Sequence, residues 1–346
     1  MKGRKFTVGS IALVVYAGGG SAQPPAVAQE PANTVSGWTA PLTLFGQPDL
    51  QGMWANNGAT PLERPEVFAE KPKLTEEELA ALKQRAAELF SSAGGDAAFS
   101  DQVFVAVATG AEEFTSSDGG TGNYNQFWLA DREFDSRTSL VTDPPDGRVP
   151  LRPEVRQRME EGRAQRADDA IPASWEQLGN LTRCITNGLP NLLAGYNTNY
   201  QIVQTPNHVM ILQELMHEAR VIPLDGRPHL PSDIPQLLGD SRGHWDGDTL
   251  VVETTNFTNK TSLRGAGENL HLTERFTRVG PDTLAYEFTV ADPTTFTQPW
   301  TAMIPLKKTE DLIFEYACHE GNRGLEGILA GARAEDRAAA DAATQR

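Results

Sequence analysis

Titratable side chains are concentrated in one stretch of the sequence, residues 214–248. The three histidines there are His217, His229 and His244, and the three arginines are Arg220, Arg227 and Arg242. After Glu214 the stretch adds six aspartates or glutamates. Histidine transfers protons near neutral pH, and arginine holds anionic groups or a developing oxyanion. Such a mixture between strands is typical of a functional site on loops held by a rigid scaffold.

The leading hypothesis is general acid–base catalysis by this stretch together with residues nearer the C-terminus. We predict that His217 and His319 transfer protons and that Glu274 orients or accepts them. The residues expected to bind substrate are Arg220, Arg242, Asp240, His229 and Tyr316. The substrate would be a small, partly apolar molecule, and the reaction that of a lyase, isomerase or hydrolase.

A metal site is an alternative interpretation of the same histidines. His217, His229 and a carboxylate would form a ligand set for a hydrolytic metal ion. The sequence has no HExxH motif and no paired CxxC motifs, and it lacks a usable phosphate- or dinucleotide-binding glycine loop. We therefore expect no organic cofactor and keep a metal ion only as a possibility.

Glu274 occupies an unusual place in the alternation of its predicted strand. Leu272, Glu274 and Phe276 share one face, whereas the residues between them are polar. A carboxylate on an apolar face is either paired with an arginine or held at a raised pKa for proton transfer. The sequence leaves both interpretations open.

The elements that must position these residues are mainly β. Strands are expected at residues 200–204, 208–214, 219–224, 249–256, 270–279, 283–291, 300–306 and 312–318. The connections are short, with turn signals such as Gly280-Pro281-Asp282, and no helix-length segment separates the strands. The pattern predicts an antiparallel up-and-down, lipocalin-like barrel with an N-terminal helical or irregular segment and a C-terminal helix.

Helices are expected outside this β region. Thr75 and Glu78 form a capping box before an apolar helix face, and further helices are predicted at 154–166 and 325–343. Residues 91–122 are rich in Gly, Ala and Ser and are expected to form a mobile loop. A strand, a turn and a second strand are expected around residues 145–147.

The chain ends and the cysteines indicate an exported protein. Residues 1–22 begin with basic residues, continue with a short apolar run and end in small residues, which is typical of a signal peptide. Cys184 and Cys318 are predicted to form a disulfide in an oxidising periplasmic or secreted location. The alternative, a reactive Cys318 thiol beside His319, has poor geometry on a strand. The expected organisation is 1–22 signal peptide, 23–60 extended entry, 61–180 helical and irregular segment, 181–325 barrel and 326–346 helix or tail.

The negative net charge of the chain argues against two classes of binding partner. The formal charge of −16 repels nucleic acid and anionic membrane surfaces, so we expect a small-molecule partner, no nucleic acid and no stable membrane insertion. The sequence makes no prediction of oligomeric state.

Several motifs resemble those of a large family of exported bacterial proteins to which no common function is assigned. The motifs are PLDGRPH, GDSRGHWDGDTLVVETTNF and EYACHEGN, and with others they spread over most of residues 48–333. The resemblance implies one fold and an exported location, and it implies an arginine at position 244, where this chain has His244. The β region also has a weaker similarity to lipocalin-like barrels.

Two other functions compete with the acid–base enzyme. One is a non-catalytic, lipocalin-like periplasmic binder of a hydrophobic ligand, since barrels of this size hold one small molecule. The other is the metal-dependent hydrolase described above.

Overall fold

The computed structural model describes residues 37–89, 102–110, 132–167, 172–192, 194–261 and 263–344. The predicted signal peptide and most of the predicted loop at 91–122 lie outside these ranges. The export signal and the proposed domain boundaries therefore stay predictions.

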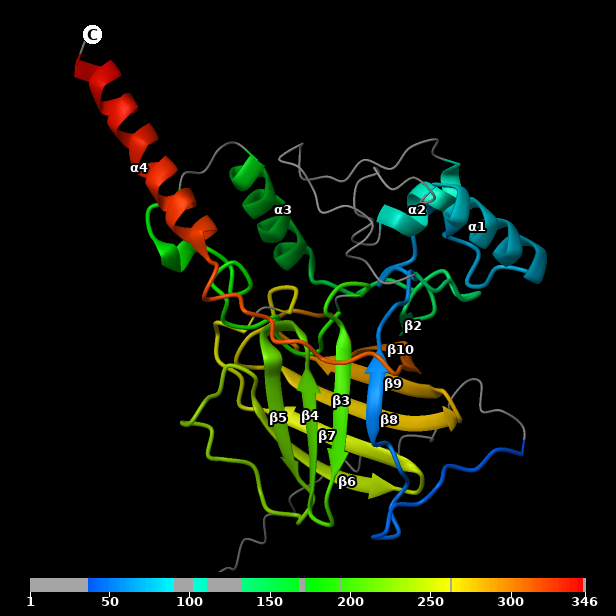
Figure 1. Ribbon diagram of the computed structural model, residues 1–346. Coiled ribbons are helices and arrows are strands. Elements are labelled where there is room, and N and C mark those ends of the chain that lie inside the picture. Colours follow the sequence, from blue (N-terminus) through cyan, green and yellow to red (C-terminus); the bar gives the residue numbers. More distant parts are fainter. Residues whose placement is uncertain are drawn as a thin grey trace, which may run out of the picture. The chain divides into compact units, whose positions relative to one another are not determined.

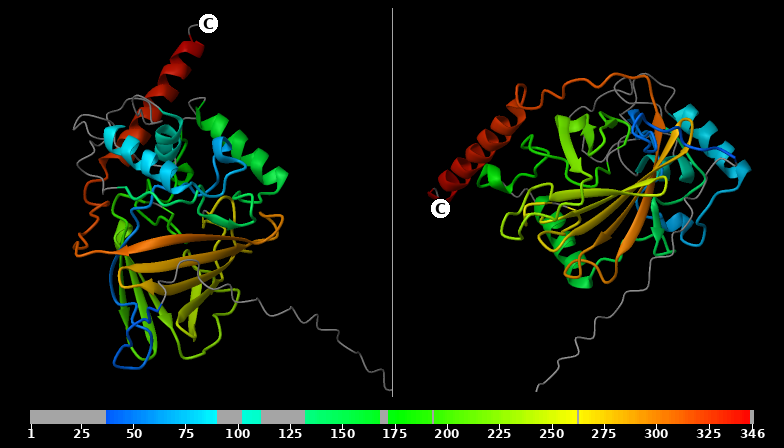
Figure 2. Two further views of the ribbon diagram at one scale, coloured as in Figure 1. Left: turned by 90° about the vertical axis from the view of Figure 1, so that its right-hand side faces the viewer. Right: turned by 90° about the horizontal axis from the view of Figure 1, so that it is seen from below.

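The described residues form a mainly β fold around one antiparallel sheet (Figure 1). The strands are β1 (Gly52–Ala55), β2 (Val141–Asp143), β3 (Asn199–Gln204), β4 (His208–Gln213), β5 (Glu218–Pro223), β6 (Asp240–Asp246), β7 (Thr249–Thr255), β8 (His271–Gly280), β9 (Thr283–Ala291) and β10 (Trp300–Lys308). Within the described ranges their order is β5-β4-β3-β1-β10-β9-β8-β7-β6, and β2 pairs with β10. One wall holds β1 and β3 to β5, and β6 to β10 form the facing wall (Figures 1 and 2). The predicted antiparallel barrel is confirmed, in a nearly closed form.

The two end strands of the sheet, β5 and β6, meet without a hydrogen-bonded ladder between them in the described residues. They approach closely at Gly243 of β6. A Cβ atom added there would lie 2.9 Å from Ile222 Cγ2 and 2.7 Å from Leu224 Cδ2. Apolar side chains therefore close the barrel along this line, and only glycine leaves them the space.

The interior of the barrel is filled by alternate residues of each strand. Leu272, Glu274 and Phe276 are buried on β8, as the alternation predicts, and an aromatic series continues from them. The rings of Phe276 and Tyr286 stack with centroids 4.6 Å apart, and Phe288 lies 5.8 Å from Trp300 edge to face. Burial of these large apolar surfaces is the main stabilising contribution to the wall packing.

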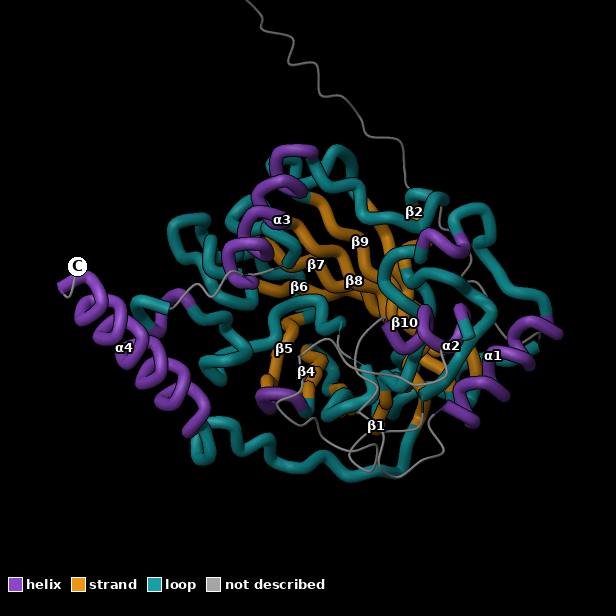
Figure 3. The backbone as a smooth tube through the Cα atoms, turned by 90° about the horizontal axis from the view of Figure 1, so that it is seen from above, coloured by secondary structure: helices purple, strands orange, loops and turns teal. Residues whose placement is uncertain are grey.

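The helices gather beyond one end of the barrel (Figures 1 and 3). They are α1 (Glu76–Leu89), α2 (Gln102–Thr109), α3 (Pro153–Ala167) and α4 (Arg323–Thr344), with short 3-10 turns η1 (Glu66–Phe68), η3 (Trp175–Gln177) and η4 (Leu215–His217). The capping box is formed as predicted, since Thr75 N donates to Glu78 Oε2 at 2.9 Å and Glu78 N to Thr75 Oγ1 at 3.3 Å. The C-terminal helix is also confirmed. Measured by length and hydropathy, none of the helices in the described ranges reaches what a bilayer-crossing helix requires.

Several predicted elements differ in the structure. Residues 312–318 form no ladder, so the strand predicted there is wrong. The segment Asp240–Asp246, which is absent from the predicted strands, is strand β6. Helix α2 lies inside the predicted loop at 91–122, and no strand follows the turn at 145–147. Strand β1, which lies in the predicted entry segment, pairs with β3 and β10.

Candidate functional site

A buried ion pair crosses the barrel interior between β5 and β8. The Glu274 side chain is 0 % exposed, and Arg220 contacts it through both terminal nitrogens. Arg220 Nη2 donates to Glu274 Oε1 at 2.9 Å, and the Tyr286 hydroxyl donates to the same oxygen at 2.7 Å. The interpretation of Glu274 as a buried partner of an arginine is therefore confirmed. Its carboxylate is occupied by these donors.

The electrostatics of this pair fix the charges of its members. Burial acts to lower the pKa of Arg220, but the charge and hydrogen bonds of Glu274, with smaller contributions from Tyr286 and Tyr200, together outweigh burial, and the pKa is raised. Burial, together with the negative charge of Glu274, raises the pKa of Tyr286 and of the buried phenol of Tyr200. Arg220 is therefore a cation and both tyrosines are neutral hydrogen-bond donors over the physiological pH range.

A row of polar side chains lies beside this ion pair, at the end of the barrel where β4 finishes and β5 begins. Tyr200, Gln213 and Glu218 are direct neighbours across β3, β4 and β5, because Tyr200 pairs with Gln213 and Gln213 with Glu218. Alternation places all three toward the interior, together with Arg220 two residues further along β5. We call Tyr200, Gln213 and Glu218 the polar row.

Three atoms of this region lack a hydrogen-bond partner among the described residues. Gln213 Oε1, Glu218 Oε2 and Arg220 Nε are buried and have no hydrogen-bond partner within the part of the chain that the structure describes. Gln213 is only 5 % exposed. Buried polar atoms are almost always hydrogen-bonded in folded proteins. Two acceptors and one donor at neighbouring positions therefore mark a place where another molecule can complete the hydrogen bonding.

The polar row is covered by residues 186–192, which we call the cover segment. Thr186, through its side chain, and Asn187, through its backbone, hydrogen-bond to the Glu218 carboxylate. The Tyr200 hydroxyl donates to the Asn191 carbonyl at 3.3 Å. Burial raises the pKa of Glu218, while these hydrogen bonds and the charge of Arg220 act in the opposite direction. The carboxyl group is thus partly desolvated but retains one oxygen for a further partner.

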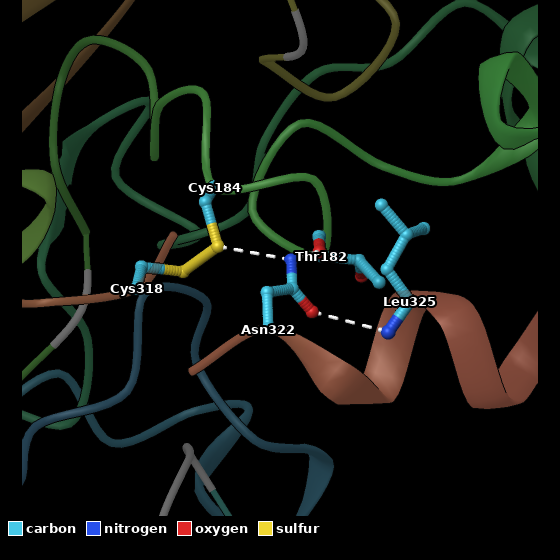
Figure 4. The surroundings of a disulfide bond; sticks show 5 residues. All are labelled: Thr182, Cys184, Cys318, Asn322 and Leu325. Atoms are coloured by element: carbon cyan, nitrogen blue, oxygen red, sulfur yellow. Dashed lines mark hydrogen bonds between the residues drawn. A yellow bond between two sulfur atoms is a disulfide. The ribbon is translucent and has the colours of Figure 1, made fainter. Parts of the chain in front are cut away.

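The disulfide between Cys184 and Cys318 is present, as predicted, and anchors the start of this cover (Figure 4). Asn322 Nδ2 donates to Cys184 Sγ at 3.1 Å, and Asn322 Oδ1 accepts the Leu325 N–H at 3.1 Å. Asn322 is therefore the N-cap of α4 and a contact of the disulfide at the same time. The disulfide also packs against the η4 turn that leads into β5.

The two histidines predicted to transfer protons lie near the disulfide but point to no common acceptor. His217 and His319 are both exposed, and each follows a residue of the cluster around the disulfide. Neither ring has a hydrogen bond or ion pair to the described residues. Tyr316, the predicted substrate contact, is half-buried against the same cluster. The structure does not bring these residues together with Glu274, which lies inside the barrel.

A second polar cluster joins the other predicted residues. His229 Nδ1 lies 2.9 Å from Asp240 Oδ2, Leu230 N donates to that oxygen at 2.9 Å, and Arg242 Nη1 donates to Asp240 Oδ1 at 2.7 Å. Burial acts to raise the pKa of Asp240, but these hydrogen bonds outweigh it and the pKa is lowered. Arg242 also donates to the Pro228 carbonyl at 3.0 Å. The cluster therefore ties the loop before β6 to its first residues.

The structure separates His217 from His229. His217 precedes the first residue of β5, whereas His229 follows its last residue, Pro223, by six positions. The two therefore belong to opposite ends of a strand of six residues, roughly 20 Å long. Among the described residues, no group of three or more His, Cys, Asp or Glu side chains is arranged to hold a metal ion.

Gln213 and Glu218 were not among the predicted site residues. The signal was available, because Val209, Ile211 and Gln213 alternate on one face of β4 as Leu272 and Glu274 do on β8. In both strands a polar residue on an otherwise apolar face marks a functional or paired side chain.

Comparison with known proteins does not indicate a function for this chain. A functional proposal therefore has to rest on the chain's own residues. No family model matches the chain, and no curated protein matches it. Among solved structures, a variant of the fluorescent protein UnaG is similar, with 14 % sequence identity over 38 % of this chain and 88 % of that one, and a TM-score of 0.23. A TM-score this low supports no statement about function. The resemblance to exported bacterial proteins stays a prediction from the motifs.

Proposed function

We propose that this protein is an exported binder of a small molecule, with the polar row and Arg220 as its binding site. The observation that carries the proposal is a set of three buried atoms that have no partner among the described residues: Gln213 Oε1, Glu218 Oε2 and Arg220 Nε. They come from neighbouring positions on two paired strands, which hold them at fixed distances from one another.

The energetics favour a ligand at this place. A buried donor or acceptor without a partner costs about 1–3 kcal/mol. A molecule that satisfies several of them at once recovers part of that cost and releases no protein hydrogen bond. The nearby Arg220–Glu274 pair fixes the guanidinium in place, so little side-chain order has to be created on binding.

One observation supports the hypothesis of an acid–base enzyme. It concerns Glu218, which is not one of the predicted catalytic residues. Glu218 has a raised pKa, an oxygen that no described residue hydrogen-bonds, and a cation two positions away. A carboxylate of that kind is suited to accept a proton from a bound molecule. Catalysis by Glu218 is therefore the second candidate function, and conversion of a bound compound would distinguish it from binding alone.

The proposed export is supported by the cysteines. A disulfide between residues 134 positions apart is typical of proteins that fold in an oxidising compartment. We place the protein in the periplasm or the medium on this ground and on the basic, then apolar, start of the sequence.

The test is native mass spectrometry after incubation with a metabolite extract, followed by denaturation to identify retained compounds. The variant Gln213→Leu should lose the retained compound. The matched control is Gln201→Leu, because Gln201 is the outward-facing neighbour of Tyr200 on β3 and should retain it. If the parent protein retains nothing, or if both variants retain the compound equally, the proposed site is wrong. A compound released with a changed mass would support catalysis.

A further inference from the structure

The charges around the polar row do not balance. Glu274 and Arg220 neutralise one another through two hydrogen bonds. Glu218 is a second carboxylate, and its neighbours from the cover segment and β4, namely Thr186, Asn187 and Gln213, are uncharged. Arg220 attracts it from the same strand but is already paired. The site therefore carries a formal charge of about −1 when Glu218 is ionised, which favours a cation as partner.

The hydrogen-bonding groups agree with this charge. Gln213 Oε1 and Glu218 Oε2 are acceptors, whereas Arg220 Nε is a donor. An ammonium group has three donors and no acceptor, so it can serve both oxygens. A hydroxyl or carbonyl oxygen close to it can accept the Arg220 Nε–H. A carboxylate or phosphate offers only acceptors and would face two oxygens of the same polarity.

The field of the whole chain acts in the same direction. With a net charge of −16 the protein attracts small cations and repels small anions before contact. The sequence predicts that Arg220 binds substrate through an anionic group. In the structure its guanidinium is paired with Glu274.

We infer that the ligand of the polar row is a small amine, bound as its ammonium ion, with a hydroxyl or carbonyl group beside the amine. The inference rests on the proposed function and names its substrate class. Glu218 and Gln213 receive the ammonium, and Arg220 donates to the neighbouring oxygen.

Three two-carbon probes of similar size separate the possible classes: ethanolamine, ethylene glycol and glycolate. Each has a hydroxyl group, and they differ in carrying an ammonium, a second hydroxyl or a carboxylate. Binding is followed at constant ionic strength by the ¹H–¹⁵N signals of the Arg220 Nε–H and the Gln213 side-chain amide. Ethanolamine should shift both signals in a saturable way and bind about tenfold more tightly than ethylene glycol, the effect of one charge-assisted hydrogen bond. Glycolate should shift neither.

The variant Glu218→Gln retains the shape of the side chain and removes its charge. It should abolish the preference for ethanolamine over ethylene glycol. Glu253→Gln is the matched control, because Glu253 is exposed on the outer face of β7 and its loss should leave the preference unchanged.

The outcomes separate this inference from the proposed function. A preference for glycolate, an unchanged preference in Glu218→Gln, or no shift with any probe overturns the amine inference. If the extract experiment still yields a compound lost in Gln213→Leu, the binding function stands and only the ligand class is wrong. If the extract yields no compound, the binding function itself is overturned.

Discussion

Replacing Arg220 with methionine tests the central electrostatic feature of the barrel. The substitution keeps much of the apolar stem and leaves Glu274, which is 0 % exposed, without its cation. Removing one partner of a buried ion pair costs about 3–5 kcal/mol, since the remaining charge stays desolvated. That cost is a large share of the roughly 5–15 kcal/mol by which domains are usually stable. We expect urea denaturation to report a loss of this size.

Two comparisons make the interpretation specific. The exposed pair between Arg275 and Asp246, at 3.0 Å, is the matched control, and Arg275→Met should cost less than about 1 kcal/mol. In the triple variant Arg220→Met, Glu274→Leu, Tyr286→Phe no member of the ion pair and no hydroxyl bonded to it is left behind. Its stability should therefore lie within about 1–2 kcal/mol of the parent protein.

A loss under about 1 kcal/mol in Arg220→Met, or an equal loss in Arg275→Met, would refute the argument.

Three other perturbations follow from the described contacts. Cys318→Ser opens a link between residues 134 positions apart, and should lower the unfolding free energy by up to about 5 kcal/mol in denaturant titrations, matching the parent protein under reductant. Thr75→Ala removes the cap of α1 and should cost about 1 kcal/mol by the same titration, whereas an unchanged midpoint would contradict the capping role. Asp240→Asn weakens the attachment of the loop before β6, and endoproteinase Asp-N should cleave before the exposed Asp233 faster than in the parent protein. Because the pKa of Asp240 is lowered in the folded state, its contribution to stability is present above the unfolded value of about 3.9 and is lost as the pH falls through the folded value, so parent and variant should converge on acidification.

The sequence correctly predicted the strands that show a clear polar–apolar alternation and are followed directly by turn residues. In β8 the alternation placed Glu274 correctly, and the Gly280-Pro281-Asp282 turn marked the end of the strand. It failed for residues 312–318, which have a strand-like composition but no neighbouring strand to pair with. It also failed for β6, whose polar residues have low β propensity. That strand forms because the turn at Gly247 brings it against β7.

The site was harder to predict than the fold because it depends on register between strands. Gln213 and Glu218 are separated by the η4 turn in sequence and become direct neighbours only through the pairing of β4 with β5. Conversely, His217 and His229 are close in sequence, and β5 carries them to opposite ends. A high density of titratable residues along a chain therefore says little about which of them meet.

The contact at Gly243 has a mechanical consequence for the barrel. The other neighbouring strands of the described barrel are joined by backbone hydrogen bonds. Moving two of those strands apart would break these directional bonds. Between β5 and β6 the resistance comes from the apolar contact of Ile222 and Leu224 with the glycine backbone. Dispersion contacts of this kind weaken gradually with distance and have no preferred angle. The barrel therefore opens most easily between β5 and β6. Strand β5 also carries Glu218 and Arg220.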